Sequence, residues 1–147
     1  IKIKVLIIGN GSNQLKLQNL INRNKLNHNV KILNNISNPF PYLLKSNLFI
    51  LSSLYEGLPN VILEALTLNK FVISTNCPTG PSEILDNGKG GILVPLKNYK
   101  QLSQKILFFK KNSKSLQKKL SYAKKRLVRF DYDSNINEYY RFIKNFI

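Results

Sequence analysis

Five short apolar runs alternate along the first two-thirds of this chain with segments in which apolar residues recur at helical spacing. Apolar runs of this length, bounded by turn residues, are typical of strands buried on both faces of a sheet. Strands that alternate with helices favour a parallel sheet covered by helices. The sequence therefore predicts an α/β fold, a Rossmann-like, doubly wound parallel sheet of about five strands. The expected strands lie within residues 4–9, 29–33, 47–53, 70–75 and 90–95.

After residue 95 the pattern is helical only. Helices are expected at about 99–111, 113–129 and 134–146. We expect residues 1–111 to form the Rossmann-like domain and residues 112–147 to form basic C-terminal helices packed on it. The last of these helices carries several aromatic residues and is expected to expose an apolar face.

Composition limits the classes of protein that remain. The chain has 147 residues, of which 43% are hydrophobic, and this is enough for the core of one domain. The single cysteine, Cys77, excludes an internal disulfide, and Cys and His together are too few for a zinc cluster. We therefore expect no metal site and a reducing, cytoplasmic location.

The formal net charge is +16, and it is concentrated toward the C-terminus, where residues 99–147 hold 13 Lys and Arg against 3 Asp and Glu. Such a charge favours polyanions, whether nucleic acid, anionic lipid or phosphorylated substrates. A general bias toward Lys, Asn and Ile explains the charge equally well. A nucleic-acid-binding module is the less favoured alternative, because the aromatic residues are not interleaved with the basic ones as stacking platforms would be. The apolar stripe of the helix at 113–129 fits either a solvated helix or peripheral attachment to an anionic membrane surface.

The segment "YEGLPNVILEAL" contains two acids in an unexpected setting. Its helix, 60–68, is apolar almost all the way round and should be buried, yet Glu64 lies in the middle of it. Glu56 precedes it by eight residues, directly before Gly57. A buried carboxylate needs partners, because an unpaired charge is very costly to bury. A salt bridge to a lysine or a partly exposed position would satisfy Glu64, and so would the two hydroxyls of a ribose.

The start of this helix is a candidate anion site. Gly57 permits unusual backbone angles or the close approach of a ligand. Pro59 lacks an N–H and suits a first helical turn, and Asn60 is a suitable cap nearby. The free N–H groups at such a helix start, together with the helix dipole, favour phosphate. Plain turn chemistry and a surface acid remain the alternative interpretation.

This segment resembles the signature of retaining glycosyltransferases of family 4, in the GT-B class. That signature has two acids separated by seven residues, with Gly, an apolar residue and Pro after the first and Ala after the second. The segments "VLIIGNGSNQLKLQNLI", "NVKILNNISNPFPYLLKSNLFILSS" and "PTGPSEILDNGKGGILVP" resemble the family in the same register. The residues that match in the signature are Glu56, Gly57, Leu58, Pro59, Glu64 and Ala65.

The resemblance implies a donor-binding half with a role for each matching position. Glu64 would bind ribose hydroxyls of a nucleotide sugar, and Glu56 would act catalytically beside the transferred sugar. The backbone N–H groups of residues 57–60, which include Leu58, Pro59 and Asn60, would lie against sugar or phosphate oxygens. The loop containing Asn35 and Ile36 would lie near the base. No cofactor is expected beyond the nucleotide-sugar donor, with UDP favoured over GDP.

The resemblance also implies a partner. The family's diphosphate-binding Arg and Lys lie upstream of the first strand, and its acceptor domain precedes them. We therefore expect this chain to be half of an enzyme, a hexosyl- or N-acetylhexosaminyltransferase, that does not transfer sugar unaided. An N-terminal half or separate subunit, and an acceptor sugar or lipid-linked sugar, are the implied partners, in the synthesis of cell-surface polysaccharide or lipid-linked oligosaccharide. A non-catalytic interaction protein that keeps only the fold remains the alternative, and no nucleic acid is expected.

Overall fold

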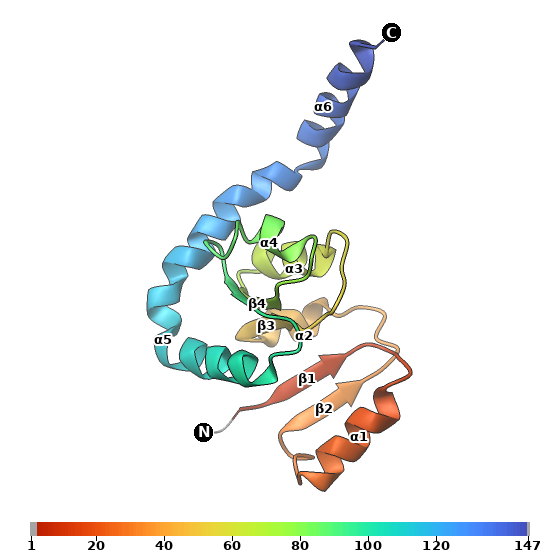
Figure 1. Ribbon diagram of the computed structural model, residues 1–147, viewed down its shortest axis with the longest axis vertical. Coiled ribbons are helices and arrows are strands. Elements are labelled where there is room, and N and C mark those ends of the chain that lie inside the picture. The colour runs from red at the N-terminus through yellow and green to blue at the C-terminus, as the bar shows by residue number, and fades with distance from the viewer. Residues whose placement is uncertain (1–2, 147) are drawn as a thin grey trace. The chain divides into compact units, whose positions relative to one another are not determined.

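All five apolar runs form strands, and they pair only in parallel across residues 3–146, which this computed structural model describes (Figure 1). The chain divides into two units between Tyr42 and Leu43, within helix α2 (Phe40–Lys45). Each unit holds one sheet, β1-β2 in the first and β3-β4-β5 in the second. The expected parallel α/β fold is confirmed, with its strands distributed over two sheets.

The first unit is a strand, a helix and a second strand. Strands β1 (Val5–Ile8) and β2 (Val30–Leu33) pair in register along their full length, and α1 (Gln14–Arg23) connects them. Asn13 occupies the N-cap position of α1, and its side chain makes no capping hydrogen bond.

The second unit is built on its central strand. Strand β4 (Phe71–Thr75) pairs with β3 (Leu48–Leu51) on one side and with β5 (Ile92–Val94) on the other. Every residue of β4 is buried. A continuous apolar run is what such a strand requires, because it has a neighbour at each edge and a covering layer on each face.

Helices α3 (Asn60–Thr67) and α5 (Tyr99–Arg126) both pack on β4. Since α3 buries only Ile62, Ala65 and Leu66, the expectation of a helix buried all round is wrong, and Val61 is exposed. The helical segments of this unit are α3 (Asn60–Thr67), α4 (Pro81–Ile84), α5 (Tyr99–Arg126), the 3-10 helix η1 (Leu127–Phe130) and α6 (Tyr132–Lys144).

The core of the second unit joins α3, β4 and α5. Phe71 of β4 stacks on Phe109 of α5 with ring centroids 5.3 Å apart. Apolar burial of this kind is the main source of folding free energy. The buried members of the cluster are Ile62, Ala65, Leu66, Phe71, Val72, Ile73, Ile84, Leu85, Val94, Leu116, Leu120 and Ala123.

Helix α5 has a kink at Asn112, whose backbone angles (φ −122°, ψ 19°) are not helical. The sequence predicts two helices that meet at this residue, and the structure joins them in one bent element. The C-terminal half buries Leu116, Leu120 and Ala123. The expected domain boundary at residue 111 stays a prediction, since α5 runs across it.

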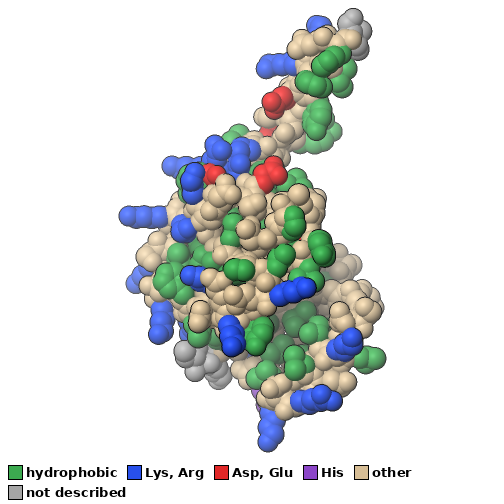
Figure 2. Space-filling model, viewed as in Figure 1, with side chains coloured by type: hydrophobic (Ala, Val, Ile, Leu, Met, Phe, Trp, Pro, Cys, Tyr) green, Lys and Arg blue, Asp and Glu red, His purple; other side chains and the backbone are tan. Residues whose placement is uncertain are grey.

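Helix α6 is capped at its N-terminus by Asp131, whose carboxylate accepts hydrogen bonds from the backbone N–H (3.0 Å) and hydroxyl (2.8 Å) of Ser134. These bonds lower the pKa of Asp131, the backbone bond most. The apolar face predicted for this helix is exposed, and hydrophobic side chains are visible along it in Figure 2. Its exposed apolar residues are Tyr132, Ile136, Tyr139, Tyr140, Phe142 and Ile143.

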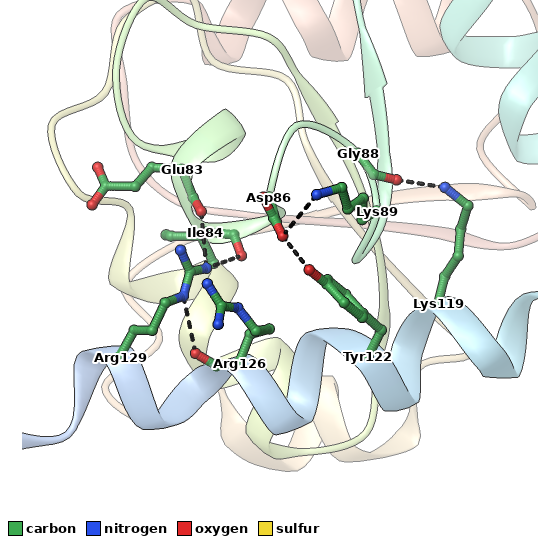
Figure 3. A network of polar contacts seen from close by, with 9 residues as sticks. All are labelled: Glu83, Ile84, Asp86, Gly88, Lys89, Lys119, Tyr122, Arg126 and Arg129. Carbon is green, nitrogen blue, oxygen red and sulfur yellow. Dashed lines mark hydrogen bonds and ion pairs between the residues drawn. The ribbon is translucent and has the colours of Figure 1, made fainter.

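Two basic side chains of the C-terminal helices bind backbone carbonyls around α4 (Figure 3). The Arg129 guanidinium donates to the carbonyls of Glu83 (3.1 Å) and Ile84 (3.3 Å), and so satisfies groups at the end of α4. The Lys119 ammonium donates to the carbonyl of Gly88 in the loop that follows. These bonds attach the segment between α4 and β5 to α5 and η1.

A carboxylate lies at the centre of the same network (Figure 3). Asp86 accepts a hydrogen bond from the Tyr122 hydroxyl, and the Lys89 ammonium lies 3.6 Å from it. The bond from Tyr122, assisted by the Lys89 charge, lowers the pKa of Asp86. The same bond raises the pKa of Tyr122.

The Asp86 contribution to stability is therefore present above its unfolded-state pKa of about 3.9 and is lost as the pH falls through its folded-state pKa. The Tyr122 contribution is present below about pH 10 and is lost as the pH rises through its raised pKa.

We expect Tyr122→Phe to raise the pKa of Asp86, because the substitution removes the hydrogen bond that most favours the carboxylate. The measurement is a pH titration of the Asp86 carboxyl carbon by NMR. Tyr99→Phe, at an exposed tyrosine of the same helix, is the matched control and should leave this titration unchanged. An unaltered Asp86 titration in Tyr122→Phe would contradict the assignment.

Candidate functional site

The acid loop, residues 52–59, follows β3 and leads into α3. Pro59 is buried and occupies the N-cap position with extended backbone angles (φ −74°, ψ 90°), and Asn60 is the first helical residue. The expectation that Asn60 caps the helix is therefore wrong. Proline fits the position because a cap needs a fixed, non-helical backbone and an N–H is not required there.

Several backbone N–H groups at this loop are free to bind a ligand. Within the described residues, the N–H groups of Gly57, Leu58, Asn60 and Val61 donate to no protein acceptor. Pro59 has no N–H to offer, and its carbonyl accepts from the N–H of Ile62 at 2.9 Å. Unpaired N–H groups at the start of a helix carry partial positive charge and attract anions.

The two acids of the motif, Glu56 and Glu64, both lie in the second unit and are half-buried. Glu56 lies in the acid loop, and Glu64 lies in α3 on the side of the helix opposite the buried Ile62 and Leu66. Among residues 3–146 no hydrogen bond or ion pair reaches either carboxylate, so the lysine salt bridge considered for Glu64 is not formed there. Both carboxylates thus keep their acceptor oxygens available within the described part of the chain.

Gly57 is open on the side where a β-carbon would lie. No atom would come within 4 Å of such a carbon, and the φ angle of Gly57 is not positive. The glycine is therefore required neither by packing nor by backbone geometry, contrary to the first reason considered for it. The remaining reason is close approach by a ligand.

The loop after β4, residues 76–80, holds none of the predicted site residues and lies against the acid loop. The Thr75 hydroxyl donates to the carbonyl of Ser53 at 2.5 Å, and the Cys77 thiol donates to the same oxygen at 3.2 Å. The Thr79 hydroxyl donates to the carbonyl of Glu56. Because adjacent parallel strands end at the same edge of a sheet, the contact between these loops follows from the pairing of β3 with β4.

The remaining two candidate residues belong to the first unit. Asn35 has a left-handed backbone (φ 52°), and its amide oxygen accepts from the Asn10 side chain at 2.7 Å. Its N–H donates back to the Asn10 side-chain oxygen at 3.2 Å. Ile36 is half-buried, and the buried side-chain oxygen of Asn34 has no partner among the described residues. The loops after β1 and β2 are thereby tied together, while the other six candidates lie in the second unit.

No group of three or more His, Cys, Asp or Glu residues is arranged to hold a metal ion within residues 3–146.

The family model described as "Glycosyl transferases group 1" matches residues 1–126. The chain belongs to this family. An uncharacterized glycosyltransferase of Methanocaldococcus jannaschii is 55% identical over 82 residues, which are 56% of this chain and 20% of that protein. The N-acetylgalactosamine-N,N'-diacetylbacillosaminyl-diphospho-undecaprenol 4-alpha-N-acetylgalactosaminyltransferase of Campylobacter jejuni is 29% identical over 129 residues, 88% of this chain and 35% of that protein.

A solved structure shows the same fold. The crystal structure of Anabaena HepE in complex with UDP matches with a TM-score of 0.87 at 20% identity, over 97% of this chain and 41% of HepE. The matched part of the chain therefore spans between a fifth and about two-fifths of the length of these proteins.

Gly57→Ala is expected to fold with a free energy of unfolding within about 1 kcal/mol of wild type, since the added methyl meets open space and the φ angle suits an L-residue. Gly91→Ala is the control, because a β-carbon there would lie 2.9 Å from the Val72 carbonyl oxygen and should destabilise by about 1–3 kcal/mol. Chemical denaturation measures both. A large loss in Gly57→Ala would show that the glycine serves folding.

Proposed function

We propose that this chain is the donor-binding half of a retaining GT-B glycosyltransferase of family 4, which takes a nucleotide sugar. The observation that carries the proposal is that two half-buried carboxylates and four backbone N–H groups, none with a partner within residues 3–146, lie in the acid loop and in helix α3, which follows it. Carboxylates accept bonds from sugar hydroxyls, and N–H groups donate to phosphate or sugar oxygens. The site thus offers acceptors and donors in the combination that a sugar nucleotide requires.

Each candidate residue has a role in this proposal. Glu64 accepts hydrogen bonds from the two ribose hydroxyls, each such bond contributing about 1.5–3 kcal/mol. Glu56 contacts the transferred sugar and stabilises the positive charge that develops on it in the transition state. The N–H groups of Gly57, Leu58 and Asn60 bind sugar or phosphate oxygens, and Pro59 fixes the turn that presents them.

The loop of Asn35 and Ile36 is proposed to read the base through its backbone. UDP is the favoured nucleotide, and the fold likeness to HepE, which was crystallised with UDP, supports that choice. The name of the C. jejuni relative supports transfer of an N-acetylhexosamine to a lipid-linked acceptor. We accordingly propose a hexosyl- or N-acetylhexosaminyltransferase in the synthesis of lipid-linked oligosaccharide or cell-surface polysaccharide. The acceptor would bind an N-terminal half or a separate subunit.

The test is an NMR titration of UDP and GDP onto the chain and onto Glu64→Gln. We expect UDP to bind more tightly than GDP, and the dissociation constant for UDP to rise about 10- to 100-fold in Glu64→Gln, because the charge-assisted bonds to ribose are lost. Glu83→Gln, at an exposed acid of α4, removes the same charge and should leave binding unchanged. Absence of nucleotide binding in wild type, or equal binding by all three proteins, would overturn the proposal and favour a non-catalytic interaction protein.

The domain organisation and location complete the proposal. Residues 1–111 form the nucleotide-sugar-binding domain and residues 112–147 the basic helices.

We place the protein in the cytoplasm, attached peripherally to an anionic membrane surface. No helix within residues 3–146 is both long and apolar enough to span a bilayer. The proposed attachment is electrostatic, through exposed lysines of α5 on the side opposite the buried Leu116 and Leu120. Figure 2 shows Lys and Arg side chains gathered over this part of the molecule.

The triple substitution of Lys114, Lys118 and Lys125 by Gln is expected to weaken binding to vesicles that contain phosphatidylserine by about 100-fold, at about 1 kcal/mol for each lysine near an anionic surface. Co-sedimentation with vesicles of anionic and of purely zwitterionic lipid is the measurement.

The control for this experiment has the same net charge. Lys16, Lys25 and Lys31 are exposed lysines of the first unit, and their replacement by Gln should leave vesicle binding nearly unchanged. An equal loss in both triple variants would show that net charge alone governs binding. Failure of the wild-type protein to bind anionic vesicles would contradict membrane attachment.

A further inference from the structure

The loop after β4 contacts the acid loop through two adjacent residues. The Thr79 hydroxyl donates to the carbonyl of Glu56. Gly80, the next residue, lies against Gly57 and Pro59 so closely that a β-carbon on it would be 2.1 Å from the Gly57 oxygen and 2.5 Å from Pro59 Cδ. Contacts this short leave no room for any side chain at residue 80.

Gly80 has backbone angles that only glycine adopts readily (φ 90°, ψ −72°). They lie near those of the rare classic γ-turn. The hydrogen bond that closes such a turn would come from the N–H two residues after Thr79, and that residue is Pro81, which has none. Surrounding contacts must therefore hold the turn in place. Unusual backbone of this kind persists only where the structure around it is over-determined.

The contacts on the far side of Gly80 supply that support. Gly80 caps α4, and its carbonyl accepts from the N–H of Ile84 at 2.9 Å. The carbonyls at the end of α4 are bound by Arg129, and the loop beyond is held by the hydrogen bond between Asp86 and Tyr122 (Figure 3). A continuous set of contacts thus runs from α5 and η1 through α4 to the acid loop.

These contacts determine which way two peptide groups of the acid loop face. The carbonyl of Glu56 points to the Thr79 hydroxyl. From the position of a β-carbon on Gly80, the Gly57 oxygen is 2.1 Å and the Gly57 carbon 3.2 Å away. The difference is close to the C=O bond length of about 1.23 Å, so this carbonyl points almost directly at Gly80. In a planar trans peptide the N–H points opposite to the C=O. The N–H groups of Gly57 and Leu58 therefore face away from the β4 loop.

We propose that Thr79 and Gly80 are positioning residues that hold the N–H groups of Gly57 and Leu58 in the orientation for binding the donor. They touch no reacting atom, and they act through the two peptide groups that they fix. The consequence for donor binding rests on the proposed function, whereas the fixing of the loop does not. Preorganised N–H groups bind an anion without ordering the loop at that moment, so their loss would weaken binding.

The first test uses the ¹⁵N-labelled chain and Thr79→Val, which keeps the shape of the side chain and removes the donor. We expect the NMR order parameters of the Gly57 and Leu58 amides to fall from about 0.85 toward 0.6 or below. The dissociation constant for UDP should rise about two- to tenfold, the effect of one hydrogen bond. Thr79→Ser retains the hydroxyl and should restore both values, and Thr67→Val, at an exposed threonine of α3, should change neither.

The second test compares two alanine substitutions. Gly80→Ala and Gly88→Ala both place alanine at a φ near 90°, but only the first creates a clash, since nothing lies within 4 Å of a β-carbon on Gly88. We expect the amide signals of Gly57 and Leu58 to shift in Gly80→Ala and to stay in place in Gly88→Ala. If Gly80→Ala does not fold, the comparison of Thr79→Val with Thr79→Ser decides whether the loop is fixed by these contacts.

Each outcome has a distinct meaning. Unchanged order parameters in Thr79→Val would overturn the proposal, whatever happens to UDP. Lower order parameters with an unchanged UDP dissociation constant would overturn the link to donor binding. Wild-type protein that binds no UDP would defeat the proposed function alone, because the amide measurements still decide whether Thr79 and Gly80 fix the loop.

Discussion

Burial of strand β4 is the constraint on which the second unit depends. Its five residues are buried because β3 and β5 pair at its edges and α3 and α5 cover it. Both neighbours are parallel to β4, and parallel neighbours end at one edge of the sheet. The loops after β3 and β4 therefore meet. The hydroxyl of Thr75, the last residue of β4, makes the first bond between them.

The elements that the sequence predicts well are those with strong local patterns. Each apolar run became a strand within about two residues at each end, because a run of four or five β-branched and apolar residues has few alternatives to burial in a sheet. The break at Asn112 was also foreseen, since the helical pattern changes there. Helix caps were predicted poorly. Asn60 is a good cap by residue type, but Pro59 occupies the N-cap position of α3 and Asn60 is the first helical residue.

The candidate site divides in the same way. The spacing of Glu56 and Glu64 and the glycine beside the first acid are local signals, and the prediction of a site at the acid loop rests on them. The role of Gly80 is not a local signal. Its lack of a side chain is explained by Gly57 and Pro59, which lie more than 20 residues earlier in the chain. Only the Gly-Pro pair hinted at a special turn, and no one-dimensional pattern names the partner of such a contact.

The burial of Cys77 has a consequence for the kinetics of this edge of the sheet. Cys77 is 2% exposed and its thiol shares the Ser53 carbonyl with Thr75, so we expect a reagent to reach the sulfur when the two loops separate. Because it is the single cysteine of the chain, its rate of alkylation reports one local opening event with no competing signal. The alkylation rate of Cys77 therefore measures how often the acid loop and the loop after β4 separate. Mass spectrometry can follow this rate without any label or substitution.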